Sequence, residues 1–478
     1  MKHADIIQKL NLEQKCALLS GETVFTTRAL PGKGIPAITL SDGPNGVRKQ
    51  AGAADHLGLN PSVPATCFPT SSATACSWDE KLGEAVGEAL GEEAAAQEVA
   101  VLLGPGLNIQ RSPLCGRDFE YFSEDPILAG RMAAAYVRGI QKNGISACPK
   151  GTLDNSQELR RMASDSVLDE RTLRELYLTG FEIVGKEAKP KTIMTSYNLI
   201  NGTYANENAH LLQDILRKDW GFDGAVVTDW GGSNDHALGV KNGSTLEMPC
   251  PGGDSIRELM KAVQDGKISE ADVDARLDEM LELVLSTHAA VEKAPRTFDA
   301  AAHHKLARRA AAESIVLLRN EGGILPLKPN EKLAVIGDFA ETPRYQGAGS
   351  SAVNALQVDT LLDSIKADDS GITLVGYASG FERQGAADAE KLEEAVALAK
   401  KADTVLLCLG LDELRESEGL DRSDMKLAEN QQQLLAAVAA VNPNVVVLLS
   451  AGAPIETPWA GQCRALVYGA LGGQAGAG

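Results

Sequence analysis

The sequence lacks several features that mark whole classes of protein. In its 478 residues, no apolar run approaches the roughly 18 that a membrane helix needs; the longest strand-like stretch covers residues 444–453. Basic residues are outnumbered, with 46 Lys and Arg against 65 Asp and Glu, which gives a formal net charge of −19. Because phosphate binding needs a basic surface, we expect neither a membrane nor nucleic acid as a partner.

Signals for export and for disulfides are also missing. Residues 1–22 enter an amphipathic helix pattern at once, without the roughly 7–15 apolar residues of a signal-peptide core, so we expect a cytoplasmic protein. The eight cysteines include no CxxC pair, and several lie in apolar surroundings such as VLLCLG at 405–410. We therefore expect free, buried thiols, with disulfides or zinc as the alternatives.

The common metal and nucleotide motifs are absent as well. The seven histidines form no HExxH or similar spacing, and we expect the pair His303-His304 to lie on a solvated helix face. The apolar segment 333–337 is followed by DFAETP rather than GxGxxG, and neither GxxxxGKS nor GxxxxGKT occurs. No GxSxG elbow is present, which argues against a serine hydrolase. The sequence thus predicts no metal and no cofactor.

Short apolar strands alternate with amphipathic helices from residue 35 to about residue 230, which is typical of a βα parallel architecture. Each predicted strand ends in polar residues. The strands are expected at 36–40, 100–104, 144–148, 192–195 and 224–228. A TIM-like (β/α) barrel builds its active site on this one rim, so residues 1–290 are predicted to form such a barrel.

A second βα series follows a helix-rich, less patterned linker at 291–312. We expect its strands at 314–318, 333–337, 372–376, 404–410, 445–450 and 465–469, with a helix at 386–401. Residues 313–478 are therefore predicted to form a smaller α/β sandwich domain with a parallel sheet.

Carboxylates at strand ends are the remaining candidates for chemistry. Asp229 closes the strand at 224–228; by itself it could equally be a cap or a salt-bridge partner. Asp42, Lys150, Arg161 and Tyr197 fall on or beside neighbouring strand ends. Such a rim offers a carboxylate nucleophile among donors suited to a polyhydroxylated ligand.

Seven collinear segments across nearly the whole chain resemble glycoside hydrolase family 3 of the β-glucosidase type. They are LSDGPNGVR (40–48), GPGLNIQRSPLCGRDFEYFSEDP (104–126), RRMASDSVLDERTLRELYL (160–178), TSYNLINGTYANEN (195–208), VVTDWGG (226–232), ESIVLLRNEGGILPL (313–327) and ESEGLDR (416–422). The resemblance implies a retaining exo-acting β-glucosidase that hydrolyses small β-glucosides or oligosaccharides through a covalent glycosyl-enzyme intermediate.

The resemblance also implies roles for single residues. Asp229 matches the family's nucleophile, and Glu418 matches the general acid/base, with Glu413 and Glu416 as nearby rivals. The positions expected to bind the sugar are Asp42, Arg117, Lys150, Arg161 and Tyr197. Trp230 would flank the same pocket, although an aromatic there is also ordinary core filling.

The two acids must differ in protonation, because a retaining glycosidase needs carboxyl groups about 5–5.5 Å apart, one ionised and one protonated. Asp229 lies among Lys150, Arg161 and a tyrosine, so we expect it to be ionised. Glu418 lies in a stretch that also contains Glu413, Glu416 and Asp421. Repulsion from these neighbours predicts a protonated Glu418.

The chain departs from the family pattern at two points. Where the family has Lys-His-Phe, this chain has Lys150-Gly151-Thr152, so one donor to the sugar is missing, and we expect a depressed kcat/KM on simple glucosides that a histidine at 151 would raise. The chain also ends within GALGGQAGAG, a segment that the family continues. The second domain is therefore expected to be incomplete, whether the chain is a fragment, a truncated protein or one part of a nicked pair completed by a missing segment or second chain.

Other functions remain open at this stage. A β-xylosidase or broad-specificity β-glycosidase fits the same residues, because the sequence does not define how the pocket treats the hydroxymethyl group. A family 3 N-acetylglucosaminidase is disfavoured, since no KHFPGxG segment is present. A carbohydrate-binding homologue with weakened or lost activity is a third alternative. The aglycone and the oligomeric state are not defined by the sequence.

Overall fold

Five short parallel strands form the centre of the first domain. The computed structural model describes residues 1–52, 60–151, 155–249 and 252–478. The five strands are β1 (Leu40–Asp42), β2 (Val101–Leu103), β3 (Ser146–Ala147), β5 (Thr192–Met194) and β8 (Ala225–Val227). All five predicted barrel strands are thus present, although β1 begins at the residue where the pattern predicted its end.

The strands form a barrel-type arc. β1, β2 and β3 pair in parallel in that order, and β5 pairs in parallel with β8. The backbone N–H of Met194 donates to the carbonyl oxygen of Pro149 at 3.0 Å and so connects the two groups of strands. A parallel bridge from Val227 to Leu246 extends the arc. The carboxyl ends of all five strands therefore share one rim.

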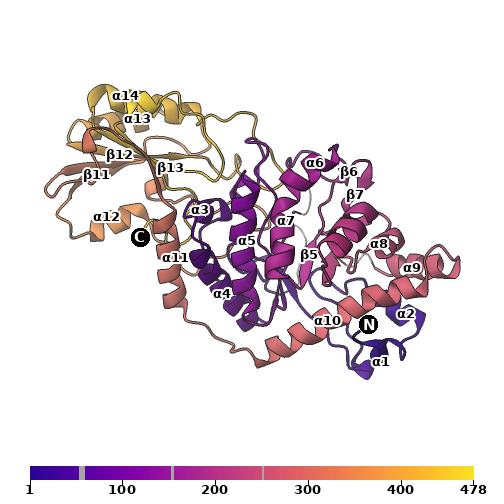
Figure 1. Cartoon of the computed structure of the whole chain (residues 1–478). Coiled ribbons are helices and arrows are strands. Elements are labelled where there is room, and N and C mark those ends of the chain that lie inside the picture. The colour runs from indigo at the N-terminus through magenta and orange to yellow at the C-terminus, as the bar shows by residue number, and fades with distance from the viewer. Residues whose placement is uncertain (53–59, 152–154, 250–251) are drawn as a thin grey trace.

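Helices surround this arc (Figure 1). They are α1 (Ala4–Ile7), α2 (Leu12–Ala17), α3 (Ser71–Ala75), α4 (Glu80–Ala96), α5 (Pro126–Gln141), α6 (Glu170–Thr172), α7 (Thr179–Ile183), α8 (His236–Asn242), α9 (Asp254–Gln264) and α10 (Glu270–Lys293). π-helical turns occur at η3 (Leu173–Tyr177), η4 (Val184–Ala188) and η6 (His210–Asp219), and 3₁₀ turns at η1 (Pro31–Lys33), η2 (Asp118–Glu120) and η5 (Ala205–Glu207). A small sheet beside the rim contains β4 (Asp165–Ser166), β6 (Leu199–Ile200) and β7 (Thr203–Tyr204).

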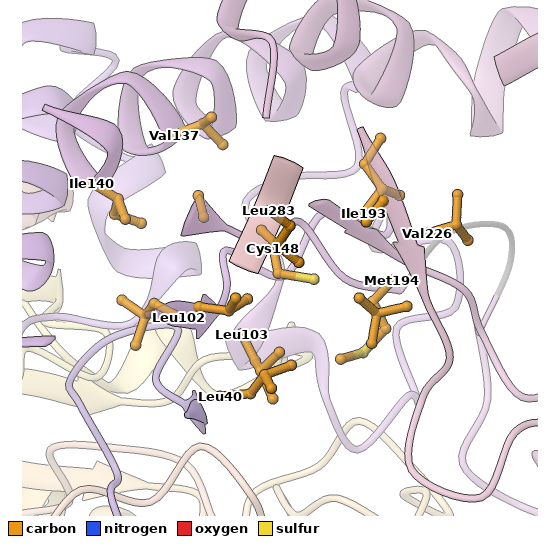
Figure 2. Close-up of a cluster of buried hydrophobic side chains, with 14 of the residues drawn as sticks. Leu40, Leu102, Leu103, Val137, Ile140, Cys148, Ile193, Met194, Val226 and Leu283 are labelled. Atoms are coloured by element: carbon orange, nitrogen blue, oxygen red, sulfur yellow. The ribbon is translucent and has the colours of Figure 1, made fainter. Parts of the chain in front are cut away.

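The core of the first domain forms where strand and helix side chains meet. Figure 2 shows Leu102 and Ile193 from the strands facing Val137 of α5 and Leu283 of α10, all of them buried. Full burial of each such side chain contributes about 1.5–3 kcal/mol to the free energy of folding, so this cluster stabilises the strands that form the rim.

A mixed six-stranded sheet organises the second domain. Its strand order is β11 (Thr373–Ala378), β10 (Lys332–Ile336), β12 (Thr404–Gly410), β13 (Val445–Ser450), β14 (Ala465–Tyr468) and β9 (Val316–Asn320). Helices α12 (Leu361–Ala367), α13 (Ala389–Ala399) and α14 (Glu429–Val441) pack on it, with 3₁₀ turns η7 (Glu321–Gly323), η8 (Asp338–Ala340) and η9 (Ala460–Gln462). The prediction of a parallel sheet holds for five strands and is wrong for β9, which pairs antiparallel with β14 at the sheet edge.

Two further findings concern sequence expectations. Among the described residues, seven cysteines are free and six of these are buried, whereas Cys250 lies outside the described residues. No helix within the described ranges is both long enough and apolar enough to span a bilayer. The domain and linker boundaries stay predictions; the structure has α10 reaching Lys293 and α11 (Ala300–Ser314) beginning seven residues later.

Helix α11 connects the domains (Figure 1), and its two histidines are not solvated as predicted. His303 is buried, with Nδ1 2.6 Å from Oε1 of Glu93 and Nε2 3.1 Å from Oε2 of Glu92 on α4. His304 instead contacts Asp359 of the second domain, at 2.9 Å. The prediction failed because two successive helix residues face different partners, one in each domain.

The buried His303 should make folding pH-dependent. Burial alone would lower its pKa, but its bonds to Glu93 and Glu92 outweigh burial and raise it. A raised folded pKa contributes stability that is complete below the unfolded value of about 6.5 and is lost as pH rises through the folded value. We expect His303→Gln to cost about 1–3 kcal/mol at pH 6 and less at pH 9, measured by chemical denaturation.

The matched control is His288→Gln on α10, whose partner Glu292 is mostly exposed. This control should change stability little at either pH. An equal loss at pH 6 and pH 9 for His303→Gln would contradict the assignment of a charged His303.

Candidate active site

One pocket of about 640 Å³ brings together residues of both domains. All eight site residues predicted from the sequence line it. They are Asp42, Arg117, Lys150, Arg161, Tyr197, Asp229, Trp230 and Glu418. Seven of these belong to the barrel, and Glu418 alone comes from the second domain.

The strand ends position four of the barrel residues. Asp42 is the last residue of β1, and Lys150 follows β3. Tyr197 lies between β5 and β6, and Asp229 follows β8. Because these parallel strands end at one rim, residues up to about 190 positions apart in sequence face the same space.

Loops supply the other charged groups. Arg117 directly precedes η2, Arg161 lies in the segment before β4, and Glu418 lies in the long connection from β12 to α14. The guanidinium of Arg161 also stacks over the ring of Tyr197, with 4.7 Å from Cζ to the ring centroid. This contact holds one loop residue against a strand-end residue.

Glu418 is surrounded by donors. Its Oε1 lies 2.8 Å from Nη1 of Arg161 and 3.7 Å from Nη1 of Arg117, and its Oε2 accepts the backbone N–H of Ser350 at 2.8 Å. Burial alone would raise the pKa of Glu418, but the two guanidinium groups outweigh burial and hold that pKa well below its usual range. In this arrangement Glu418 is thus a carboxylate, and the predicted protonated form is wrong.

That prediction failed because the acidic residues near Glu418 in sequence face away from it. Glu416 pairs with Arg344 at 3.0 Å, and Glu413 pairs with Arg383 at 2.9 Å. Asp421 accepts backbone N–H groups of the barrel domain. The charges that act on Glu418 are therefore cations of the other domain.

Asp229 shows the opposite trend to the prediction. Burial raises its pKa, and the nearby Glu418 adds to this, while Arg117, Arg161 and Lys150 oppose it without reversing it. Its Oδ1 accepts the backbone N–H of Trp230 at 2.8 Å. The pocket thus stabilises the negative charge more strongly on Glu418 than on Asp229.

Asp42 is a second carboxyl with a raised pKa. Burial raises it to about 6, although Lys150 lies 4.0 Å away and acts in the opposite sense. With this pKa the Asp42 carboxyl is mostly ionised at neutral pH, where it accepts hydrogen bonds.

Sequence reasoning missed the residue that orients two of the cations. Glu120, fully buried, lies 2.7 Å from Nη2 of Arg117 through Oε2 and 2.9 Å from Nζ of Lys150 through Oε1. Its i, i+3 spacing from Arg117 was a readable signal. Its partner Lys150 is distant in the chain, and only the fold brings the two together.

Further pocket residues were also missed. They are Phe25, Arg48, Gln50, Met162, Met194, Gly349, Ser350, Ala352 and Gly419. Phe25 contacts Trp230, with ring centroids 5.4 Å apart, and the indole N–H of Trp230 donates to the carbonyl oxygen of Val24 at 2.7 Å. Trp230 thus combines the two predicted roles, because it packs against a neighbour and lines the pocket.

Metal ligation has no geometric support in the part of the chain that the structure describes, where no group of three or more His, Cys, Asp or Glu is arranged to hold an ion. The pocket chemistry that is present consists of paired carboxyls and cations.

Comparison with known proteins decides the family. The model described as "Glycosyl hydrolase family 3 N terminal domain" matches residues 53–283, and the one described as "Glycosyl hydrolase family 3 C-terminal domain" matches residues 315–478. A β-glucosidase from Rhizobium radiobacter is 33% identical, over 97% of this chain and 74% of its own length. This chain belongs to glycoside hydrolase family 3.

Other family 3 members are more similar in sequence. The thermostable β-glucosidase B of Acetivibrio thermocellus is 45% identical over 98% of this chain. An exo-α-(1→6)-L-arabinopyranosidase of Bifidobacterium longum is 43% identical, also over 98%. The chain spans 62% and 63% of the lengths of these two relatives.

A solved structure gives the same result for the fold. The family 3 β-glucosidase of Bifidobacterium adolescentis superposes with a TM-score of 0.92 at 42% identity, covering 98% of this chain and 68% of its own. An N-terminal barrel-type domain followed by an α/β sandwich domain is therefore the family 3 arrangement of this chain.

The backbone conformation at position 151 favours the glycine that stands where the family has histidine. Gly151 has φ of +86°, in the left-handed region that favours glycine, and a Cβ built there would lie 3.3 Å from Cβ of Asn108. A histidine at 151 would therefore strain the loop. The Gly151→His variant would change the backbone as well as the sugar contact, so it does not test the predicted low kcat/KM by itself. Thr152, which completes the departing segment, lies outside the described residues.

The buried position of Glu120 leads to a stability prediction for this family 3 chain. Glu120→Gln keeps the shape of the side chain but leaves Arg117 and Lys150 buried without their shared carboxylate. We expect a loss of about 3–5 kcal/mol in the free energy of unfolding, measured by urea denaturation. Glu124→Gln, at an exposed position in the same segment, is the control. A loss no greater than that of the control would contradict the assigned role.

Proposed function

We propose that this chain is a retaining, exo-acting β-glucosidase. The observation that carries the proposal is that one carboxyl from each domain, Asp229 and Glu418, lines the same pocket among buried cations. Opposed carboxyl groups around one sugar ring are what the double-displacement reaction needs. The similarity to β-glucosidases, among them β-glucosidase 3B from Thermotoga neapolitana solved in complex with glucose, supports glucose as the glycone.

In the proposed mechanism, Asp229 attacks the anomeric carbon and Glu418 protonates the leaving oxygen. An Asp229–glycosyl ester results, and Glu418 then takes a proton from water as that water cleaves the ester. Asp42, Lys150 and Arg161 bind the sugar hydroxyls. These contacts fix the glycone so that the two carboxyls act on the same carbon–oxygen bond.

The protonation states of Glu418 and Asp229 in the structure require one more step in the proposed mechanism. Arg161 holds Glu418 as a carboxylate at 2.8 Å, yet a general acid needs its proton. We propose that sugar hydroxyls compete for Arg161 when substrate binds, which weakens its hold on Glu418. The proton then resides on Glu418, and Asp229 becomes the ionised member of the coupled pair.

The first test is hydrolysis of p-nitrophenyl β-D-glucoside. Asp229→Asn should lower kcat by at least about 10³-fold, since the nucleophile is lost. Glu418→Ala should lower kcat by about 10²–10⁴-fold, and added azide should raise kcat and yield β-glucosyl azide, because azide attacks the glycosyl-enzyme without a general base. The control is Glu413→Ala, a rival acid on the same loop that pairs with Arg383.

The same assay distinguishes the alternatives. The β-D-xyloside and the α-L-arabinopyranoside lack the hydroxymethyl group. A higher kcat/KM on either of them than on the glucoside would identify that sugar, and not glucose, as the preferred glycone. Glucose binding without hydrolysis of any aryl glycoside would instead indicate the carbohydrate-binding alternative. The depressed kcat/KM attributed to Gly151 stays a prediction that the panel quantifies.

The proposed role of Arg161 predicts a pH effect. Arg161→Gln removes the nearest cation from Glu418, so the pKa of Glu418 should rise and the basic limb of the kcat/KM profile should move to higher pH by about one unit. The maximum value of kcat/KM in the pH profile should also fall, because a sugar contact is lost. A basic limb that stays in place or moves to lower pH would contradict this account.

A further inference from the structure

Asp421 belongs to the second domain, but its carboxylate bonds to the barrel. Oδ1 accepts the backbone N–H of Gly116 at 3.2 Å, and the carboxylate accepts the N–H groups of Glu158 at 2.9 and 3.0 Å and of Leu159 at 2.9 Å. Three backbone donors on one carboxylate form a strong, directional attachment between the domains.

The attachment is reciprocal. The carboxylate of Glu158, in the barrel domain, accepts the backbone N–H of Gly419 at 2.8 Å and Nη1 of Arg161 at 2.8 Å. The same Arg161 nitrogen lies 2.8 Å from Glu418. The two residues that attach to the barrel, Gly419 and Asp421, thus follow Glu418 directly in the chain.

Close backbone contact reinforces these bonds. A Cβ on Gly116 would lie 1.6 Å from the carbonyl oxygen of Leu420, so only glycine allows the two loops to meet. The N–H of Arg422 donates to the carbonyl oxygen of Leu114 at 2.8 Å. Residues 419–422 thus attach to the barrel immediately after Glu418, and Asp421 accepts three of the backbone N–H groups involved.

We propose that Asp421 is a positioning residue for Glu418 in the glycosidase reaction, an inference that rests on the proposed function. Asp421 touches no pocket atom and acts by holding the loop of Glu418 on the barrel. An acid must lie within about 3 Å of the oxygen that it protonates. A displacement of about 1 Å can cost 10²-fold in rate, so loss of the attachment impairs protonation of the leaving group first.

The test compares leaving groups in Asp421→Ala. Phenyl β-D-glucoside needs an acid to expel phenolate, whereas 2,4-dinitrophenyl β-D-glucoside leaves without one. We expect kcat/KM for phenyl β-D-glucoside to fall by about 10–100-fold, which is part of the rate that general acid catalysis contributes. For the dinitrophenyl substrate, kcat/KM should fall by less than about threefold. The ratio of the two values is independent of how much of the variant folds, because the same active molecules hydrolyse both substrates.

Asp424→Ala is the matched control. Asp424 lies three residues further along the same loop, but its bonds stay within the second domain, to the N–H of Lys426 at 2.8 Å and to Arg415 at 3.7 Å. Its leaving-group ratio should equal that of the unmodified chain. An equal fall on both substrates for Asp421→Ala, or a ratio that matches the control, would overturn the inference. If the proposed function itself were wrong, the unmodified chain would hydrolyse neither substrate, and this result distinguishes that failure from failure of the inference about Asp421.

Discussion

The site depends on one interaction across the domain boundary, which is the attraction between Glu418 of the second domain and the guanidinium groups of Arg161 and Arg117 on the barrel. The barrel alone presents cations and the carboxyls of Asp42 and Asp229 at its rim. The second domain presents the carboxylate of Glu418 on a long loop. Only when the domains dock does the pocket contain a carboxyl from each domain, and the backbone attachment through Asp421 keeps that loop against the barrel.

Charge compensation explains how so many ionised groups remain buried together. Glu120 bridges Arg117 and Lys150 beneath the pocket, so these cations do not repel each other unopposed. The remaining positive charge is available to Glu418 and Asp229. Because charges in the interior are costly unless paired, Arg117, Lys150 and Arg161 each have a carboxylate partner. In the proposed mechanism, a sugar would exchange hydroxyl contacts for part of this pairing, which would link substrate binding to the protonation of the acids.

Sequence patterns identified the site residues at strand ends, whereas two of the loop residues, Arg117 and Glu418, were identified only through family resemblance. Asp42, Lys150 and Asp229 could be found because polar residues at the ends of parallel strands must share a rim. Glu418, 189 residues beyond Asp229, was found only through family resemblance. Its protonation was predicted wrongly, since neighbours in sequence were taken as neighbours in space. Glu120 has one partner three residues away, Arg117, but its second partner Lys150 and the partners of the two histidines of α11 are distant in the chain, so no local pattern could identify these contacts.

The most direct test of the central claim is a crystal structure of the chain after reaction with 2,4-dinitrophenyl 2-deoxy-2-fluoro-β-D-glucoside, which traps the glycosyl-enzyme. Our account predicts a covalent bond from the carboxylate of Asp229 to the anomeric carbon. It also predicts the carboxyl of Glu418 about 5–5.5 Å from that of Asp229, on the side of the departed aglycone. A bond to another residue, or a Glu418 carboxyl outside the pocket, would contradict it.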